Sequence, residues 1–112
     1  MSGTDTLPAG SQLVPGQYLI SVNKLYKATF ETDGNFTLSG TAQIWSTNTT
    51  GQGGESIKME PDGNLVMYNA SKYPVWMSNS GSTAQEGIKL VVTTDGHLKI
   101  MHYDQEIWSR PE

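Results

Sequence analysis

The sequence contains no cysteine, has few charged residues and lacks any long hydrophobic run. The absence of cysteine excludes disulfide bonds, thiolate catalysis and cysteine-based zinc sites. Lys and Arg number 7 and Asp and Glu number 11, which gives a formal net charge of -4. This balance disfavours a nucleic-acid partner, because such binding depends on cationic side chains that neutralise phosphates. No apolar run approaches the roughly 20 residues that span a bilayer, so membrane insertion is not expected.

The N-terminal residues have neither the basic segment nor the apolar segment of a secretory signal peptide. We therefore expect a cytoplasmic protein or one exported by a non-classical route, and a secreted protein if this sequence is that of a mature form. The length of 112 residues suits one domain, which we assign to residues 1–112.

Helical periodicity is also scarce. Apolar residues do not persist at spacings of three and four, and Gly or Pro interrupts most stretches of a dozen residues. Short alternating segments rich in β-branched and aromatic residues occur instead, at 17–22, 25–30, 64–68 and 88–92. Turn residues separate these segments, a pattern that predicts an all-β fold: a sandwich, a barrel or a prism.

Three units of about 30 residues repeat along the chain. Each unit has an Asp-Gly pair followed 12, 14 or 13 residues later by a tryptophan, and the tryptophans are separated by 31 and 32 residues. The markers are Asp33, Asp62 and Asp95 with Trp45, Trp76 and Trp108. We assign the repeats approximately to residues 13–46, 55–77 and 86–109.

Each repeat predicts a hairpin and a further strand that carries the tryptophan. Asp-Gly favours a tight turn because Gly tolerates positive φ and Asp bonds its own backbone. One unit cannot bury its apolar face alone, so we expect three units around an axis with one inward-facing tryptophan from each. Exposed indoles that stack on sugar rings are the alternative. On the strand after each turn, alternation directs one set of side chains into the core: Phe36, Leu38, Leu65, Met67, Leu98 and Ile100.

The second repeat carries a polar ladder on the opposite, outward face. Its members follow one another at every second position: Glu60, Asp62, Asn64, Val66 and Tyr68. Side chains two apart on a strand are separated by about 6.6–7 Å, roughly the size of a pyranose ring. Asp accepts hydrogen bonds, an Asn amide donates and accepts, and a Tyr hydroxyl does either, so the set suits a polyol. It includes neither a nucleophile nor a general base with an orienting partner.

The string from Glu60 to Tyr68 closely resembles the Gln-x-Asp-x-Asn-x-Val-x-Tyr signature of the bulb-type (monocot, snowdrop-type) mannose-binding lectins. The opening segment 13–19 and the Trp-x-x-Asn-(Thr/Ser) segments at Trp45 and Trp76 are also similar to that family. The resemblance implies a β-prism II fold, with three antiparallel four-stranded sheets in pseudo-threefold symmetry and tryptophans at the centre. It also implies a protein that is not an enzyme and binds mannose or mannose-containing glycans without a metal or cofactor.

The resemblance also implies a role for each residue of the second repeat. Asp62 and Asn64 bond the axial 2-hydroxyl of mannose, Tyr68 bonds the 4-hydroxyl, and Val66 contacts ring carbons. Residue 60 lies near the 2- and 3-hydroxyls, where the family has Gln and this chain has Glu60. An ionised Glu only accepts hydrogen bonds, and its charge adds to that of Asp62. We therefore expect a retained site with weaker affinity or shifted specificity.

The first and third repeats match the signature less well. The first keeps an acidic residue, the Asp and the Asn but lacks the Val and Tyr, and forms a weaker candidate site: Glu31, Asp33, Asn35 and Thr37. The third keeps only the Asp and has His97 in place of the Asn, so sugar binding through Asp95 and His97 is not expected. The role of a hairpin turn residue is sufficient for Asp95.

Other functions are disfavoured or left as alternatives. His97 and His102 are the only histidines, and without cysteine they predict no metal site. Glu60 and Asp62 are not expected to form a glycosidase pair, because such carboxylates flank the scissile bond from opposite sides.

The alternative function is a protein-interaction or toxin-like module on the same fold, with sugar binding lost or altered. The resemblance further implies a homodimer that exchanges the C-terminal strand, here residues 106–109, and by analogy a defence role.

Overall fold

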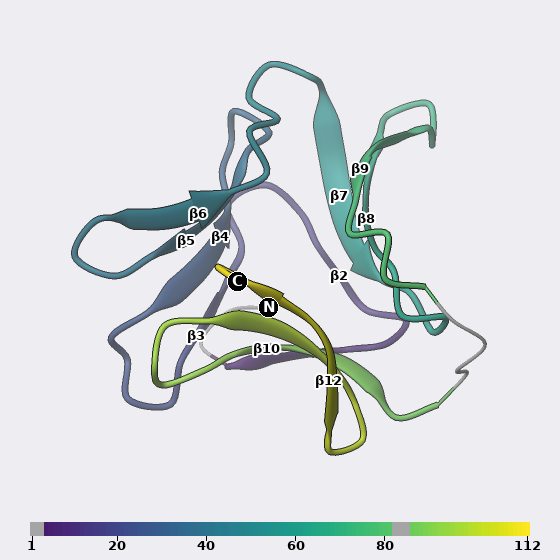
Figure 1. Cartoon of the computed structure of the whole chain (residues 1–112). Helices are drawn as coiled ribbons and strands as arrows, with labels where there is room; N and C mark the ends of the chain where they lie inside the picture. Colours follow the sequence, from purple (N-terminus) through teal and green to yellow (C-terminus); the bar gives the residue numbers. More distant parts are fainter. Residues whose placement is uncertain (1–3, 82–85) are drawn as a thin grey trace.

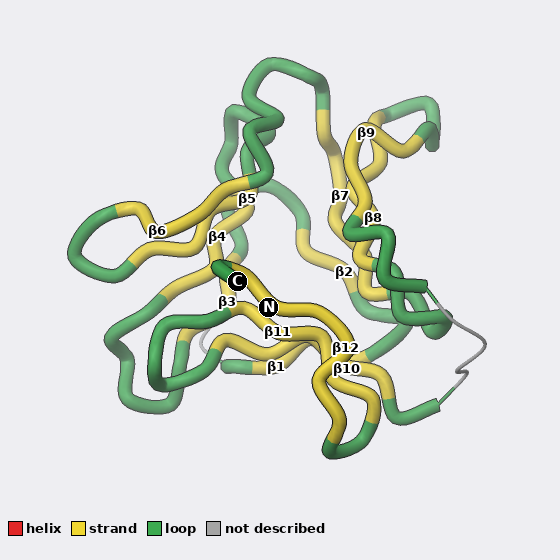
Figure 2. Tube along the Cα trace, in the orientation of Figure 1, coloured by secondary structure: helices red, strands yellow, loops and turns green. Residues whose placement is uncertain are grey.

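The computed structural model describes residues 4–81 and 86–112 of the chain. In these ranges every regular element is a β-strand, and turns and loops join the strands (Figure 2). The strands are β1 (Thr6–Pro8), β2 (Gln12–Leu13), β3 (Tyr18–Ile20), β4 (Lys27–Phe30), β5 (Phe36–Ser39), β6 (Gln43–Ser46), β7 (Gly54–Met59), β8 (Leu65–Asn69), β9 (Pro74–Met77), β10 (Ile88–Val92), β11 (Leu98–His102) and β12 (Gln105–Arg110). No helix long and apolar enough to cross a membrane occurs in these two ranges.

The strands form three four-stranded antiparallel sheets (Figure 1). The first sheet has the order β3-β4-β5-β6, the second β2-β7-β8-β9 and the third β1-β10-β11-β12. Figure 1 shows the sheets around a common centre, with the C-terminus near the middle of the view. The expected all-β class with three antiparallel four-stranded sheets is therefore confirmed.

The N-terminal segment completes two of the three sheets. β1 pairs with β10, with Leu7 opposite Leu90, and β2 pairs with β7, with Leu13 opposite Ile57. Leu13, which the repeat pattern assigns to the first unit, thus lies in the second sheet. Because consecutive strands enter different sheets, this segment connects the second and third sheets before the chain begins the first.

Alternation along the strands fills the interior with apolar side chains. The six residues expected to face the core are fully buried: Phe36, Leu38, Leu65, Met67, Leu98 and Ile100. They lie on β5, β8 and β11, the strands that follow the Asp-Gly turns, and all belong to one core cluster. Burial of such a side chain contributes about 1.5–3 kcal/mol. The inward face is therefore confirmed, and the opposite face of each of these strands remains for the candidate sites.

The three tryptophans contact one another edge to face, with ring centroids 5.8, 5.9 and 6.2 Å apart. Trp108 is buried, at 8% exposure, and the Arg110 guanidinium lies 4.8 Å from its ring centre. Trp45 and Trp76 also pack against the core but are only half-buried. All three tryptophans lie on edge strands, β6, β9 and β12, so the edge position alone does not account for the greater burial of Trp108. The indoles are thus a mutual packing unit, although their burial is less complete than expected.

Candidate functional site

The Asp-Gly turn between β7 and β8 fixes the Asp62 carboxylate. The Gly63 N–H donates to the Glu60 carbonyl over 3.1 Å, and the φ of Gly63 is 97°, a left-handed conformation that favours glycine. Asp62 Oδ1 accepts a hydrogen bond from the backbone N–H of Asn64 at 2.9 Å. The other carboxylate oxygen, Oδ2, lies 3.4 Å from Asn64 Nδ2. The turn therefore holds one carboxylate oxygen as a cap and directs the second toward the Asn64 amide.

The Asn64 side chain is oriented by the segment that follows β9. Its Oδ1 accepts hydrogen bonds from the backbone N–H groups of Ser80 and Gly81, each at 3.0 Å. Because two donors fix the amide oxygen, the amide nitrogen is left as the group that can donate elsewhere. A Cβ on Gly81 would lie 2.4 Å from that nitrogen, so only glycine leaves the amide in place. Asp62 and Asn64 thus present an acceptor and a donor side by side.

Two serines hold the same segment against β8. Ser78 Oγ accepts from the backbone N–H of Leu65 at 2.9 Å, and the hydroxyls of Ser78 and Ser80 are 2.6 Å apart. Ser80 Oγ donates in turn to the Gly63 carbonyl at 2.8 Å. The prediction of the site missed these serines. Their sequence signal is the polar segment that follows the tryptophan in the first two repeats.

Glu60 and Tyr68 form a pair rather than two independent groups. The Tyr68 hydroxyl donates to Glu60 Oε2 over 2.7 Å. This hydrogen bond, followed by burial and by the charges of Glu60 and Asp62, raises the pKa of Tyr68 to about 12. Since the single phenolic proton is committed to Glu60, both groups offer only acceptor oxygens to a ligand.

Glu60 and Tyr68 line a hollow of about 190 Å³ on the outer face of the second sheet. Two strands, β2 and β7, and the β8–β9 turn contribute its other lining residues, none of which the sequence prediction included: Gln12, Ser56, Lys58 and Lys72. Val66 is only 4% exposed, so it is a covered side chain beneath the outer face and not the open apolar patch expected. The reason is the register, because Lys58 and Met77 are its cross-strand neighbours on the same face.

The first repeat has the same turn scaffold with a different outer face. Asp33 Oδ1 accepts from the Asn35 N–H at 3.0 Å, and Asn35 Oδ1 accepts from the Thr49 N–H at 3.1 Å. Here the acidic residue, Glu31, accepts from the Thr37 hydroxyl at 3.0 Å. Thr37 is in the position equivalent to Val66, so the Glu31 carboxylate reaches toward the surface where a sugar ring would rest. This arrangement disfavours ring packing at the weaker candidate site.

The third repeat lacks the paired acceptor and donor. The His97 N–H donates to Thr93 Oγ1 at 3.0 Å, and the Thr93 hydroxyl donates to Asp95. That hydrogen bond, with a further one from His97, lowers the pKa of Asp95 below its usual value. On the adjoining strands Lys99 forms an ion pair with Glu106 at 3.0 Å. No side-chain amide is available beside Asp95, because residue 97 is His.

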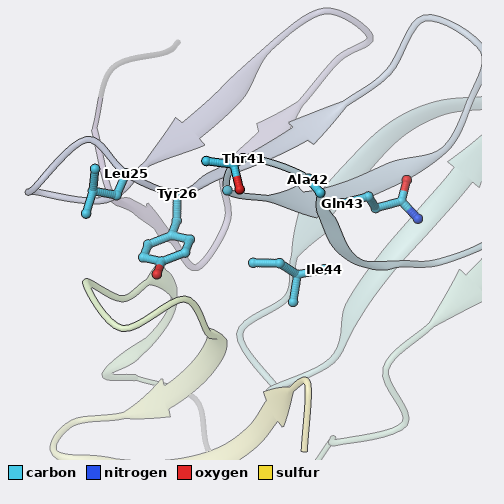
Figure 3. Close-up of a pocket in the computed structure, with 7 residues that line it drawn as sticks. Leu25, Tyr26, Thr41, Ala42, Gln43 and Ile44 are labelled. Atoms are coloured by element: carbon cyan, nitrogen blue, oxygen red, sulfur yellow. The ribbon is translucent and has the colours of Figure 1, made fainter.

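A larger hollow, of about 400 Å³, lies in the first sheet between the β3–β4 turn and the β5–β6 hairpin (Figure 3). Its lining combines apolar and neutral polar side chains, including Leu25, Tyr26, Gln43 and Ile44. The Tyr26 ring also packs at the third Asp-Gly turn, where a Cβ on Gly96 would lie 3.0 Å from it. This hollow holds neither a carboxylate nor a cation, so it offers no charged group for catalysis.

Residues 4–81 and 86–112 contain no group of three His, Asp or Glu residues that could hold a metal ion. Glu60 and Asp62 belong to one turn of one sheet, and each accepts a hydrogen bond from a neighbour on the same hairpin. The arrangement therefore presents oriented polar groups on a shallow surface, which is the chemistry of hydroxyl recognition.

Comparison with known proteins agrees with this fold. No family model matches the sequence. The B-type lectin plumieribetin of Scorpaena plumieri is 33% identical over 103 residues, which cover 92% of this chain and 91% of that protein. The mannose-specific agglutinin of snowdrop (Galanthus nivalis) bulbs, solved with methyl-α-D-mannoside, superposes with a TM-score of 0.79 at 31% identity, covering 96% of this chain and 95% of that one.

A monomeric monocot mannose-binding lectin from Gastrodia elata superposes with a TM-score of 0.85 at 28% identity, covering 96% of this chain and 97% of that one. These similarities, together with the three sheets, define the protein as a non-catalytic carbohydrate-binding lectin with the β-prism II fold. The chain belongs to the B-type lectin family, the bulb-type lectins.

Proposed function

We propose that this lectin binds mannose or mannose-containing glycans in the hollow of the second sheet. The observation that carries the proposal is the pairing of Asp62 Oδ2 with an Asn64 amide whose oxygen is already engaged by Ser80 and Gly81. One hydroxyl group can donate to the carboxylate and accept from the amide nitrogen at the same time. The snowdrop relative is a mannose-specific agglutinin and the Gastrodia relative a mannose-binding lectin, which supports the same ligand.

The stereochemistry of mannose suits this pair. Its 2-hydroxyl is axial, so it projects from the ring face toward Asp62 and Asn64, whereas the equatorial 2-hydroxyl of glucose points along the ring plane. The acceptors of Glu60 and Tyr68 then receive equatorial hydroxyls farther along the ring, above Val66. In this proposal the first-repeat set of Glu31, Asp33, Asn35 and Thr37 binds more weakly, and the third repeat does not contribute.

A calorimetric titration with methyl α-D-mannoside and methyl α-D-glucoside tests the proposal. We expect binding of the mannoside and a loss of at least tenfold in affinity for the glucoside, the effect of about 1.4 kcal/mol from one polar contact. Asp62→Ala should remove the tighter mannoside binding and leave at most the weaker binding of the first repeat. Asp33→Ala is the matched control, because Asp33 caps the equivalent turn in the first repeat and its loss perturbs the fold in the same way. Equal affinity for both sugars, or mannoside binding that keeps the wild-type affinity in Asp62→Ala, would contradict the proposal.

A protein-interaction or toxin-like module is the second candidate function. It is favoured by the exposure of Val22 at 74% and Leu25 at 64% in the β3–β4 turn, next to the hollow of the first sheet. A glycan array distinguishes the two functions, because an interaction module that no longer binds sugars would show no binding to mannose-containing glycans. The same array, printed with microbial surface glycans, tests a defence role.

We also propose a homodimer that exchanges the C-terminal strand. Within one chain β12 pairs antiparallel with β11 and carries Trp108 to the centre. An exchanged β12 would make identical contacts with a second copy, so exchange costs little beyond the hinge. Two linked sites would raise the avidity of a shallow site through effective concentration. Sedimentation equilibrium checks this proposal, and a monomer at working concentration would contradict it.

A further inference from the structure

Two lysines line the hollow of the second sheet, beside the proposed sugar-binding groups. Lys58 lies on β7 directly opposite Val66 of β8. Lys72 lies in the β8–β9 turn, where its backbone N–H donates to the Asn69 carbonyl at 3.0 Å and its φ is 70°. Neither ammonium group forms an ion pair with any residue in 4–81 or 86–112, the part of the chain that the structure describes.

The carboxylates nearby do not neutralise these lysines by direct contact. Glu60 accepts the Tyr68 proton at 2.7 Å, and Asp62 accepts the backbone N–H of Asn64. The chain as a whole carries a net charge of -4, so two unpaired cations in one small hollow are a local exception. An unpaired ammonium group is a ready partner for an anionic oxygen, and such charge-assisted bonds are stronger than neutral ones.

The hollow of the third sheet differs from that of the second in the pairing of its lysines. Its outer hollow, of about 320 Å³, also contains two lysines, Lys89 and Lys99. There Lys99 is already paired with Glu106 at 3.0 Å, which leaves Lys89 as the unpaired cation among the lining residues. The two unpaired cations beside a hydroxyl-binding pair are therefore a feature of the second sheet.

From this arrangement we infer that the hollow takes a mannoside that carries an anionic substituent, such as a phosphate, on C6. The inference rests on the proposed function. In that proposal the ring extends from its 2-hydroxyl at Asp62 to its 4-hydroxyl at Tyr68. C5 and C6 follow C4 around the ring, so a C6 substituent falls at the Tyr68 end. Lys72 lies in the turn directly after the strand that carries Tyr68, and the flexible stem of Lys58 flanks the ring from β7.

The test compares mannose, mannose 6-phosphate and glucose 6-phosphate by calorimetry at low ionic strength. Mannose 6-phosphate should bind about fivefold more tightly than mannose, the combined effect of two exposed ion pairs. High salt should remove this advantage because it screens exposed charges. Glucose 6-phosphate carries the same charge without the axial 2-hydroxyl and should bind more weakly than mannose 6-phosphate.

Matched variants assign the effect to the two lysines. The double variant Lys58→Gln/Lys72→Gln should lose the phosphate advantage, measured within the variant as the ratio of its affinity for mannose 6-phosphate to its affinity for mannose. The control Lys24→Gln/Lys89→Gln removes two exposed lysines elsewhere, and Lys24 has a φ of 64° that matches Lys72. This control should keep the advantage.

The possible results distinguish a failure of the phosphate inference from a failure of the proposed mannose-binding function. Mannose binding without a phosphate advantage, or an advantage that survives Lys58→Gln/Lys72→Gln, overturns the inference alone. Equal binding of glucose 6-phosphate and mannose 6-phosphate also overturns it, because the effect would then be plain attraction of an anion. Absence of binding by mannose and by mannose 6-phosphate refutes the proposed function and the inference with it.

Discussion

Replacement of Glu60 by Gln changes the hydrogen-bonding character of the mannose site. In the wild type the Tyr68 hydroxyl donates its proton to Glu60 over 2.7 Å, so the two side chains offer only acceptors. A Gln at position 60 still accepts from Tyr68 through its amide oxygen and adds two N–H donors toward a sugar hydroxyl. It also avoids the burial of an ionised carboxylate when the sugar covers this surface.

The expected gain follows from the exposure of the site. One neutral hydrogen bond contributes about 0.5–1.5 kcal/mol net. The half-buried position of Glu60 means that water already weakens the charged bonds of the carboxylate. We therefore expect Glu60→Gln to tighten the binding of methyl α-D-mannoside about fivefold, a change that isothermal titration calorimetry resolves.

Glu60→Gln also removes one negative charge, and a control variant must test the effect of that charge alone. Glu55→Gln removes the same charge from an exposed position of β7 outside the hollow, and its affinity for the mannoside should equal that of the wild type. An unchanged or weaker affinity in Glu60→Gln would refute the reasoning, because the carboxylate would then be the better partner for the sugar. A similar gain in both variants would assign the effect to net charge.

Three further predictions concern the same groups. In Glu60→Gln the pKa of Tyr68 should fall from about 12 toward 10, as followed by phenolate absorbance. In the wild type the raised pKa of Tyr68 stabilises the folded protein at pH values below 10. This stabilisation is lost as the pH rises toward 12. Asn64→Ala should lower the free energy of unfolding by about 1–3 kcal/mol in urea titrations, because the N–H groups of Ser80 and Gly81 lose their acceptor. Gly81→Ala should weaken mannoside binding in calorimetry, because its Cβ would lie 2.4 Å from Asn64 Nδ2.

Specific outcomes would contradict each of these predictions. A Tyr68 pKa that stays near 12 without the carboxylate would mean that burial, and not the bond to Glu60, sets it. Asn64→Ala at wild-type stability would show that water replaces the amide oxygen without cost. Wild-type affinity in Gly81→Ala would mean that Asn64 Nδ2 does not contact the sugar.

The sequence predicts the fold well because the deciding signals are local and repeated. An Asp-Gly pair such as Asp62 with Gly63 specifies a hairpin, and period-two alternation on the next strand assigns Leu65 and Met67 to the core. The placement of Asp62 and Asn64 beside each other follows from the same turn. These features depend on residues within a few positions of one another.

The rest of the site depends on register between distant segments. Lys58 meets Val66 across a hairpin, and Gln12 lines the hollow from β2, a strand distant in sequence from the second repeat. The bond from Tyr68 to Glu60 depends on how the two strands twist toward each other. None of these pairings has a signal within a single strand, which is why the covered Val66 and the lysines are found only in the folded chain.

A crystal structure of the protein with methyl α-D-mannoside tests the central claim most directly. We expect a sugar at the hollow of the second sheet, with its axial 2-hydroxyl within hydrogen-bonding distance of both the Asp62 carboxylate and Asn64 Nδ2. A saccharide bound on another surface while this hollow stays empty would contradict it.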